Sequence, residues 1–68
     1  MYNLKPVPST RMTHVGHSGN TMYIQFNDGS IYSYTNVSHS EYISFISSPS
    51  LGHELISFQR MHPYNRIR

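Results

Sequence analysis

Two stretches of alternating hydrophobic and polar residues flank the segment Asn27-Asp28-Gly29. The first runs from Met22 to Phe26 and the second from Ile31 to Tyr34. Alternation with a period of two indicates β-strands, and a short segment ending in Asp-Gly between two such runs is a strong hairpin signal. The pattern therefore predicts a β-hairpin over residues 22–34.

The length of the hairpin loop decides which side chains share a face. A two-residue loop would pair Phe26 with Ile31 and place Tyr32 and Tyr34 on the face opposite Phe26. A three-residue loop, with its glycine in the left-handed conformation, pairs Phe26 with Ser30 instead. We favour this second register, because it gathers large side chains on one face of a half-buried sheet: Met22, Ile24, Phe26, Tyr32 and Tyr34. The residues then facing outward or toward a partner are Tyr23, Gln25, Ile31 and Ser33.

A further strand is predicted before the hairpin. It spans residues 12–17, with Val15 as the best inward-facing candidate, and the turn that follows is Ser18-Gly19-Asn20. Residues 1–10 contain two prolines and show no periodic pattern. We therefore expect an extended N-terminal arm there.

The clearest helix signal lies at residues 38–41. Ser38 and Glu41 have the spacing of a capping box, in which each side chain accepts a hydrogen bond from the other residue's backbone N–H. Val37 and Tyr42 flank this box as a hydrophobic staple. A short helix is predicted to follow, with an apolar stripe at helical spacing: Tyr42, Phe45 and Ile46.

A second helix is predicted to open around Ser48 to Ser50. Its apolar positions recur at helical spacing: Leu51, Leu55 and Phe58. Pro63 ends it, and His62 before the proline is expected to be extended. The chain is thus expected to form one α+β domain over residues 11–68, a three-stranded antiparallel β-meander followed by two short helices packed on one face.

Composition narrows the class of protein. The chain has 68 residues, which is enough for one domain, and no cysteine, which excludes disulfides and thiolate metal sites. No apolar run approaches the roughly 20 residues of a membrane span, and no signal peptide is visible at the start. We therefore expect a cytoplasmic protein without a membrane partner.

The surface is predicted to carry little charge. Five Lys and Arg stand against three Asp and Glu, and only 12% of residues are charged, compared with the usual value of about a quarter. Such a surface protects only weakly against association. A homodimer is therefore one expectation for this chain.

Five short motifs occur in a characteristic order: Phe26-Asn-Asp-Gly29, Tyr32-Ser-Tyr34, residues 42–45, Ser50-Leu-Gly52 and His62-Pro-Tyr-Asn-Arg66. In this order they resemble the KTSC domain, a small bacterial and phage module that also occurs at the C-terminus of some lysyl-tRNA synthetases. The resemblance covers residues 11–67. It implies an α+β fold and, through the synthetases, a suggested link to RNA rather than a defined activity.

Aromatic side chains are the first candidates for a binding surface. Tyr32 and Tyr34 could stack on unpaired bases, as aromatic residues do in proteins that bind single strands. The hairpin register favours a core role for both, with their hydroxyls at the rim. Tyr23 is then the better exposed aromatic residue.

Basic side chains are the second set of candidates. Arg60, Arg66 and Arg68 cluster near the C-terminus and, with Lys5 and Arg11, could contact phosphates. The alternative is a solvated tail. The candidate residues for binding a partner or a nucleic acid are Tyr23, Arg60, Tyr64, Arg66 and Arg68.

Metal binding is not expected, although the chain has five histidines. His14 and His17 are three positions apart, so on a strand they point to opposite faces. His53 and His62 are nine positions apart, which matches one helical face poorly. We expect histidines that are exposed or hydrogen-bonded, and no cofactor.

Catalysis is not expected either. Ser50, His53 and Glu54 are close in sequence, but a nucleophile, its base and an orienting acid are brought together by folding rather than by adjacency. Asp28 lies in the hairpin turn and is expected to serve the turn.

Two hypotheses on function remain open. The first is a small non-enzymatic interaction module, of a kind that phages encode, which binds and modulates a host macromolecule such as a host protein. Tyr2, Tyr23 and Ile31 are its outward-facing candidates. The alternative is a module that binds RNA or single-stranded DNA through the C-terminal arginines and exposed tyrosines.

Overall fold

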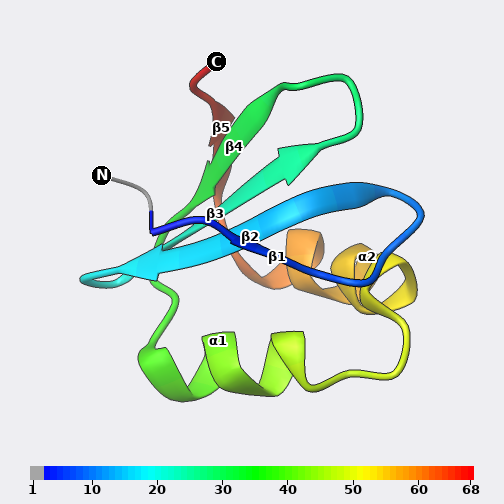
Figure 1. Ribbon diagram of the computed structural model, residues 1–68. Helices are drawn as coiled ribbons and strands as arrows, with labels where there is room; N and C mark the ends of the chain where they lie inside the picture. Colours follow the sequence, from blue (N-terminus) through cyan, green and yellow to red (C-terminus); the bar gives the residue numbers. More distant parts are fainter. Residues whose placement is uncertain (1–2) are drawn as a thin grey trace.

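Five antiparallel strands form one sheet in the computed structural model, which describes residues 3–68. The strands lie side by side in chain order: β1 (Lys5–Pro6), β2 (Met12–Ser18), β3 (Thr21–Phe26), β4 (Ile31–Tyr34) and β5 (Tyr64–Arg66). Two helices, α1 (His39–Ile46) and α2 (Leu51–Met61), separate β4 from β5. Both helices lie on the same side of the sheet, as expected (Figure 1). Tyr2, one of the outward-facing candidates, falls outside the described residues.

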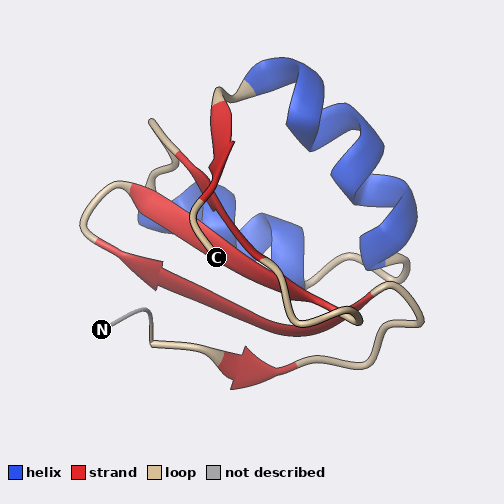
Figure 2. Cartoon of the chain, turned by 90° about the horizontal axis from the view of Figure 1, so that it is seen from above, coloured by secondary structure: helices blue, strands red, loops and turns tan. Residues whose placement is uncertain are grey.

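The two edge strands correct the expected three-stranded meander. β1 lies within the expected N-terminal arm and pairs Lys5 with Val15, and β5 extends the sheet beyond β4. In the view from above, β1 forms one edge, and β5, which follows the longer helix, lies on the far side (Figure 2). Strands of two or three residues are too short for a periodic pattern, so only their backbone pairing with β2 and β4 reveals them.

The central hairpin closes in the expected three-residue register. Met22 pairs with Tyr34 and Ile24 with Tyr32. The Phe26 N–H donates to the Ser30 carbonyl oxygen over 2.9 Å. Gly29 has a φ of 89°, which is the left-handed conformation that this loop requires.

The register places the expected residues on the helix-covered face of the sheet. On the opposite face, the structure contradicts the prediction for one residue. Met22, Ile24 and Tyr34 are fully buried there, whereas Phe26 and Tyr32 are half-buried. The prediction that Ile31 faces outward is wrong, because this residue is only 1% exposed. The C-terminal segment lies alongside it, since the N–H groups of residues 67 and 68 both donate to the Ile31 carbonyl oxygen.

Both helices begin where the sequence indicated. Ser38 and Ser50 are the N-caps, and the capping box between Ser38 and Glu41 is complete. His62 follows α2 in the extended conformation expected before a proline. The helices and the sheet enclose one core, formed by Met12, Val15, Met22, Ile24, Tyr34, Val37, Tyr42, Phe45, Leu51, Leu55 and Phe58.

Candidate functional site

Strand β5 brings C-terminal side chains next to the Tyr32-Ser-Tyr34 motif. Tyr64 lies opposite Tyr34, and Arg66 lies opposite Tyr32. Paired residues in neighbouring strands share a face of the sheet. Tyr64 and Arg66 are therefore on the helix-covered face, beside the two tyrosines of β4.

An open hollow of about 520 Å³ lies on this face, between the hairpin loop, β5 and α2. We call it the aromatic groove. It is lined by Arg11, Phe26, Asn27, Asp28, Ser30, Tyr32, Tyr34, Gln59 and Tyr64. Its volume falls within the range of about 300–1,000 Å³ that is usual for ligand sites.

The rings of the aromatic groove contact one another. Phe26 and Tyr32 meet edge to face, with ring centroids 5.4 Å apart. Tyr64 stacks on Tyr34 at 5.5 Å and lies 6.2 Å from Tyr32. Because Tyr64 remains 47% exposed, the groove presents an aromatic surface to solvent.

Tyr34 carries a polar atom that is not satisfied. Its side chain is 0% exposed, and its hydroxyl has no hydrogen-bond partner among the described residues. Burial, together with the nearby Tyr64 and Tyr32, raises the pKa of this hydroxyl above its ordinary value. The group is therefore neutral and can donate a hydrogen bond.

Asp28 gives the groove an acceptor. One of its carboxylate oxygens accepts hydrogen bonds from the Ser30 hydroxyl at 2.6 Å and from the Ser30 N–H at 3.0 Å. These bonds, with a smaller contribution from the positive charge of Arg66, lower the pKa of Asp28. The carboxylate is therefore ionised at neutral pH.

Arg11, which the sequence offered as a possible phosphate contact but which was not among the five site candidates, lines the groove. Among residues 3–68, no hydrogen bond or ion pair engages its guanidinium group. Its side chain lies against Gly52 in the first turn of α2. The sequence signal was available in the Ser50-Leu-Gly52 motif, since a glycine inside a helix needs a reason.

Some of the five predicted site residues lie at or near the aromatic groove, and the others do not. Tyr64 lines the aromatic groove, and Arg66 lies near Asp28. Arg68 is exposed at the chain end, where its carbonyl oxygen accepts from Arg66 Nε at 3.0 Å.

The other two predicted residues lie elsewhere. Arg60 is exposed on α2 and does not line the groove. Tyr23 pairs with Ser33, so it lies on the sheet face opposite the helices, where it is half-buried. The structure therefore does not bring Tyr23 together with the C-terminal candidates.

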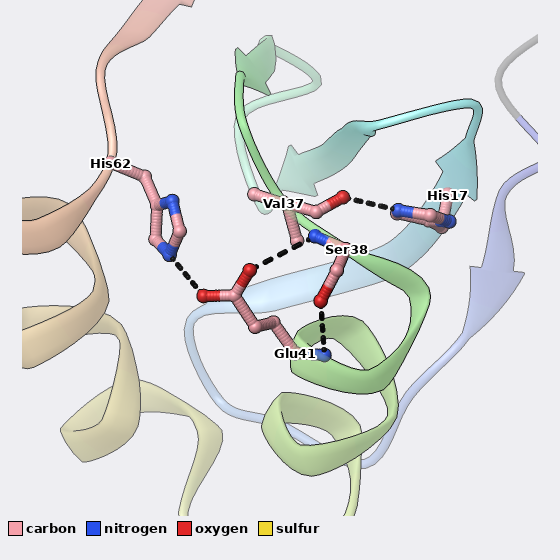
Figure 3. A network of polar contacts seen from close by, with 5 residues as sticks. All are labelled: His17, Val37, Ser38, Glu41 and His62. Atoms are coloured by element: carbon pink, nitrogen blue, oxygen red, sulfur yellow. Dashed lines mark hydrogen bonds and ion pairs between the residues drawn. The ribbon is translucent and has the colours of Figure 1, made fainter.

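A second polar cluster lies at the start of α1 (Figure 3). We call it the capping network. The Ser38 N–H donates to Glu41 Oε1 at 3.0 Å, and the Glu41 N–H donates to Ser38 Oγ at 3.1 Å. The other carboxylate oxygen of Glu41 lies 3.1 Å from Nε2 of His62, which is only 7% exposed. The Ser38 N–H, aided by His62, lowers the pKa of Glu41.

His17 completes the capping network. Its Nε2 lies 2.7 Å from the Val37 carbonyl oxygen, which can only accept, so Nε2 carries the proton. The ring stacks on Tyr42 with centroids 5.1 Å apart and meets His39 edge to face at 5.6 Å. Every polar group of this cluster that lies away from water thus has a partner, which suits a structural role.

One of the residues considered for catalysis, Ser50, is the N-cap of α2. Ser50 Oγ accepts from the His53 N–H at 3.4 Å, as an N-cap does.

Over residues 3–68, no group of three or more His, Cys, Asp or Glu side chains is placed to hold a metal ion. Neither helix of the described chain is long and apolar enough to cross a bilayer.

Comparison with known families gives one match. The model of the KTSC domain matches residues 8–54. This segment contains Arg11, both tyrosines of β4 and Gly52, whereas Tyr64 and Arg66 follow it. No curated protein matches the chain.

Proposed function

The chain belongs to the KTSC domain family, and on that premise we propose that it is a small non-enzymatic interaction module that binds a host macromolecule through the aromatic groove. The observation that carries this proposal is the buried Tyr34 hydroxyl, which has no hydrogen-bond partner among residues 3–68. Leaving a buried donor unpaired is costly, and such groups in native proteins call for an explanation. A ligand that enters the groove and displaces the side chains covering this hydroxyl would supply one.

The composition of the groove supports binding. Tyrosine and arginine are enriched among the residues that dominate binding energy at interfaces. Here three tyrosines and one arginine line a single hollow, and Tyr64 offers an exposed ring. Six of the eight polar side chains that line the groove are neutral amides or hydroxyls, which suits recognition more than chemistry.

The nucleic-acid alternative has its own support. Arg11 lines the groove, and Arg66 lies beside its carboxylate, so positive charge is near the exposed Tyr64 ring. Proteins that bind single strands combine basic side chains with aromatic stacking platforms. RNA and single-stranded DNA therefore remain candidates for the macromolecule.

A photocrosslinking experiment tests the binding surface without assuming the partner. A benzophenone amino acid replaces Gln59, which lines the groove, and in matched variants replaces Arg60 or Tyr23. In host lysate we expect discrete adducts from position 59 and none from position 60. Nuclease treatment shows whether the adduct is nucleic acid or protein. Adducts from position 23 alone, or none from position 59, would contradict the proposal.

A further inference from the structure

The backbone conformation of Gly52 does not require a glycine. This residue lies inside helix α2 and has no positive φ, unlike Gly19 and Gly29. Alanine has a higher helix propensity at such a position. What sets Gly52 apart is a neighbour: a Cβ there would lie 3.0 Å from Arg11 Cδ and 3.3 Å from Arg11 Nε.

The missing side chain therefore makes room for Arg11. The stem of Arg11 lies over the first turn of α2, and its backbone carbonyl oxygen accepts from the Asn27 N–H at 3.3 Å. Arg11 is thus held between the helix and the hairpin loop. Arg11 lines the aromatic groove, and within the described part of the chain its guanidinium group has no ion-pair partner.

We propose that the aromatic groove binds a nucleotide, with its base on Tyr64 and its phosphate on Arg11, and that Gly52 positions Arg11 for this contact. This inference rests on the proposed function, which makes the groove the binding surface. Among residues 3–68 no acid pairs with Arg11, and its guanidinium group matches the geometry of a phosphate. The nucleotide can be free or one unit of a single strand.

The rest of the lining fits a base better than an acidic peptide. Stacking on an exposed ring tolerates any base. The ionised Asp28 carboxylate can accept from a ring N–H or an exocyclic amino group of a base, and the Gln59 side chain can both donate and accept. The same carboxylate would repel an acidic side chain placed where the neutral base is proposed to lie.

The test measures binding by fluorescence anisotropy and NMR at about 50 mM salt, where phosphate contacts are strong. The probes are a fluorescein-labelled 12-residue oligouridylate and free UMP. The variants are Arg11→Met, Gly52→Ala and Tyr64→Ala. Arg60→Met is the matched control, since it removes one positive charge outside the groove.

We expect the wild type to bind, and Tyr64→Ala to weaken binding at least about fivefold, the low end for loss of one stacked base. Arg11→Met should lower the slope of log affinity against log salt by about 0.7, which corresponds to one phosphate contact on a single strand. Arg60→Met should leave that slope unchanged. Tighter binding of the oligomer identifies a strand as the ligand, and equal binding of UMP identifies a free nucleotide.

Gly52→Ala is the sharpest variant, because it keeps every charge and leaves Arg11 in the chain. We expect binding to weaken as in Arg11→Met while the melting temperature is unchanged or higher. Wild-type affinity in Gly52→Ala would overturn the positioning role, and if this variant fails to fold, Arg11→Met still tests the contact. Absence of binding to both probes would overturn the nucleotide proposal, while protein adducts from position 59 would still uphold the proposed function.

Discussion

The capping network and the aromatic groove both lie on the helix-covered side of the sheet, but they differ in whether their polar groups have hydrogen-bond partners. In the capping network, the Ser38 and Glu41 side chains satisfy each other's backbone groups, and Glu41 also reaches His62 (Figure 3). In the aromatic groove, the Tyr34 hydroxyl is buried without a partner, and the Arg11 guanidinium group is unpaired within the described residues.

The difference separates a structural site from a binding site. A network whose members are all satisfied rigidifies the fold and gains nothing from a ligand. A groove with an unsatisfied donor and an unpaired cation gains hydrogen bonds and charge pairing when a ligand arrives. The two regions should therefore respond in opposite ways to removal of their polar groups.

Phe58 joins the two regions, so its removal should have the largest effect. Its ring lies 4.4 Å from that of His62 and 6.0 Å from that of Tyr34. We expect Phe58→Ala to lower the free energy of unfolding by about 3–5 kcal/mol. That loss is comparable with the whole stability of so small a domain. Urea unfolding followed by circular dichroism measures it.

Ile56→Ala is the matched control for this prediction. Ile56 lies on the same helix but is 45% exposed, so its truncation leaves no buried cavity. We expect a much smaller loss of stability. Equal losses in the two variants would show that the burial of Phe58 contributes no more stability than an exposed side chain does.

Ser38→Ala tests the capping network. It removes the acceptor for the Glu41 N–H, and loss of a serine N-cap usually costs about 1 kcal/mol of stability. Ser40→Ala, at an exposed position of the same helix, should change stability by no more than about 0.5 kcal/mol. If thermal unfolding gives the same result for both variants, the network does not stabilise α1.

Tyr34→Phe tests the aromatic groove, and here removal of a polar group is expected to raise stability rather than lower it. It removes the unpaired hydroxyl, so the free energy of unfolding should rise by about 1 kcal/mol. Tyr32→Phe, in the same strand and half-buried, should leave stability within about 0.5 kcal/mol of the wild type. A stability loss in Tyr34→Phe would mean that the hydroxyl is satisfied in the folded protein.

The smallest expected effect is the pH dependence of the capping network. The pKa of Glu41 is lowered in the folded protein from an ordinary value of 4.5. The ionised carboxylate therefore stabilises the fold fully above pH 4.5, and this contribution is lost as the pH falls through the lowered folded-state pKa. Glutamine can also complete a capping box but does not titrate in this range.

Melting temperatures of the wild type and Glu41→Gln should therefore converge as the pH falls from 6 to 3. The pKa of Asp28, in the groove, is also lowered, from an ordinary value of 3.8. The Asp28→Asn variant distinguishes the contribution of this carboxyl group from that of Glu41. Its convergence with the wild type should begin at lower pH than that of Glu41→Gln. If the melting temperatures of the wild type and Glu41→Gln depend on pH in parallel, ionisation of the Glu41 carboxyl group does not stabilise the fold.

Local patterns in the sequence determined the centre of the fold. Alternation and the Asn-Asp-Gly loop predicted the register in which Met22 faces Tyr34, and the serine caps predicted both helix starts. These features depend on residues a few positions apart, where backbone sterics and short hydrogen bonds decide the outcome. Four of the five family motifs lie within the match over residues 8–54, and the motif at residues 62–66 lies outside it.

Only the tertiary structure decided how distant segments meet. β5 joins β4 after two intervening helices, and this pairing places Tyr64 in the groove, while residues 67 and 68 bond to the Ile31 backbone. Glu41 reaches His62, and Arg11 lies over Gly52, through contacts that no local period encodes. The physical reason is that short edge strands and side-chain packing gain their stability from partners that arrive only when the chain has folded. The hairpin and the helices follow from the sequence alone, and the candidate site follows from their assembly.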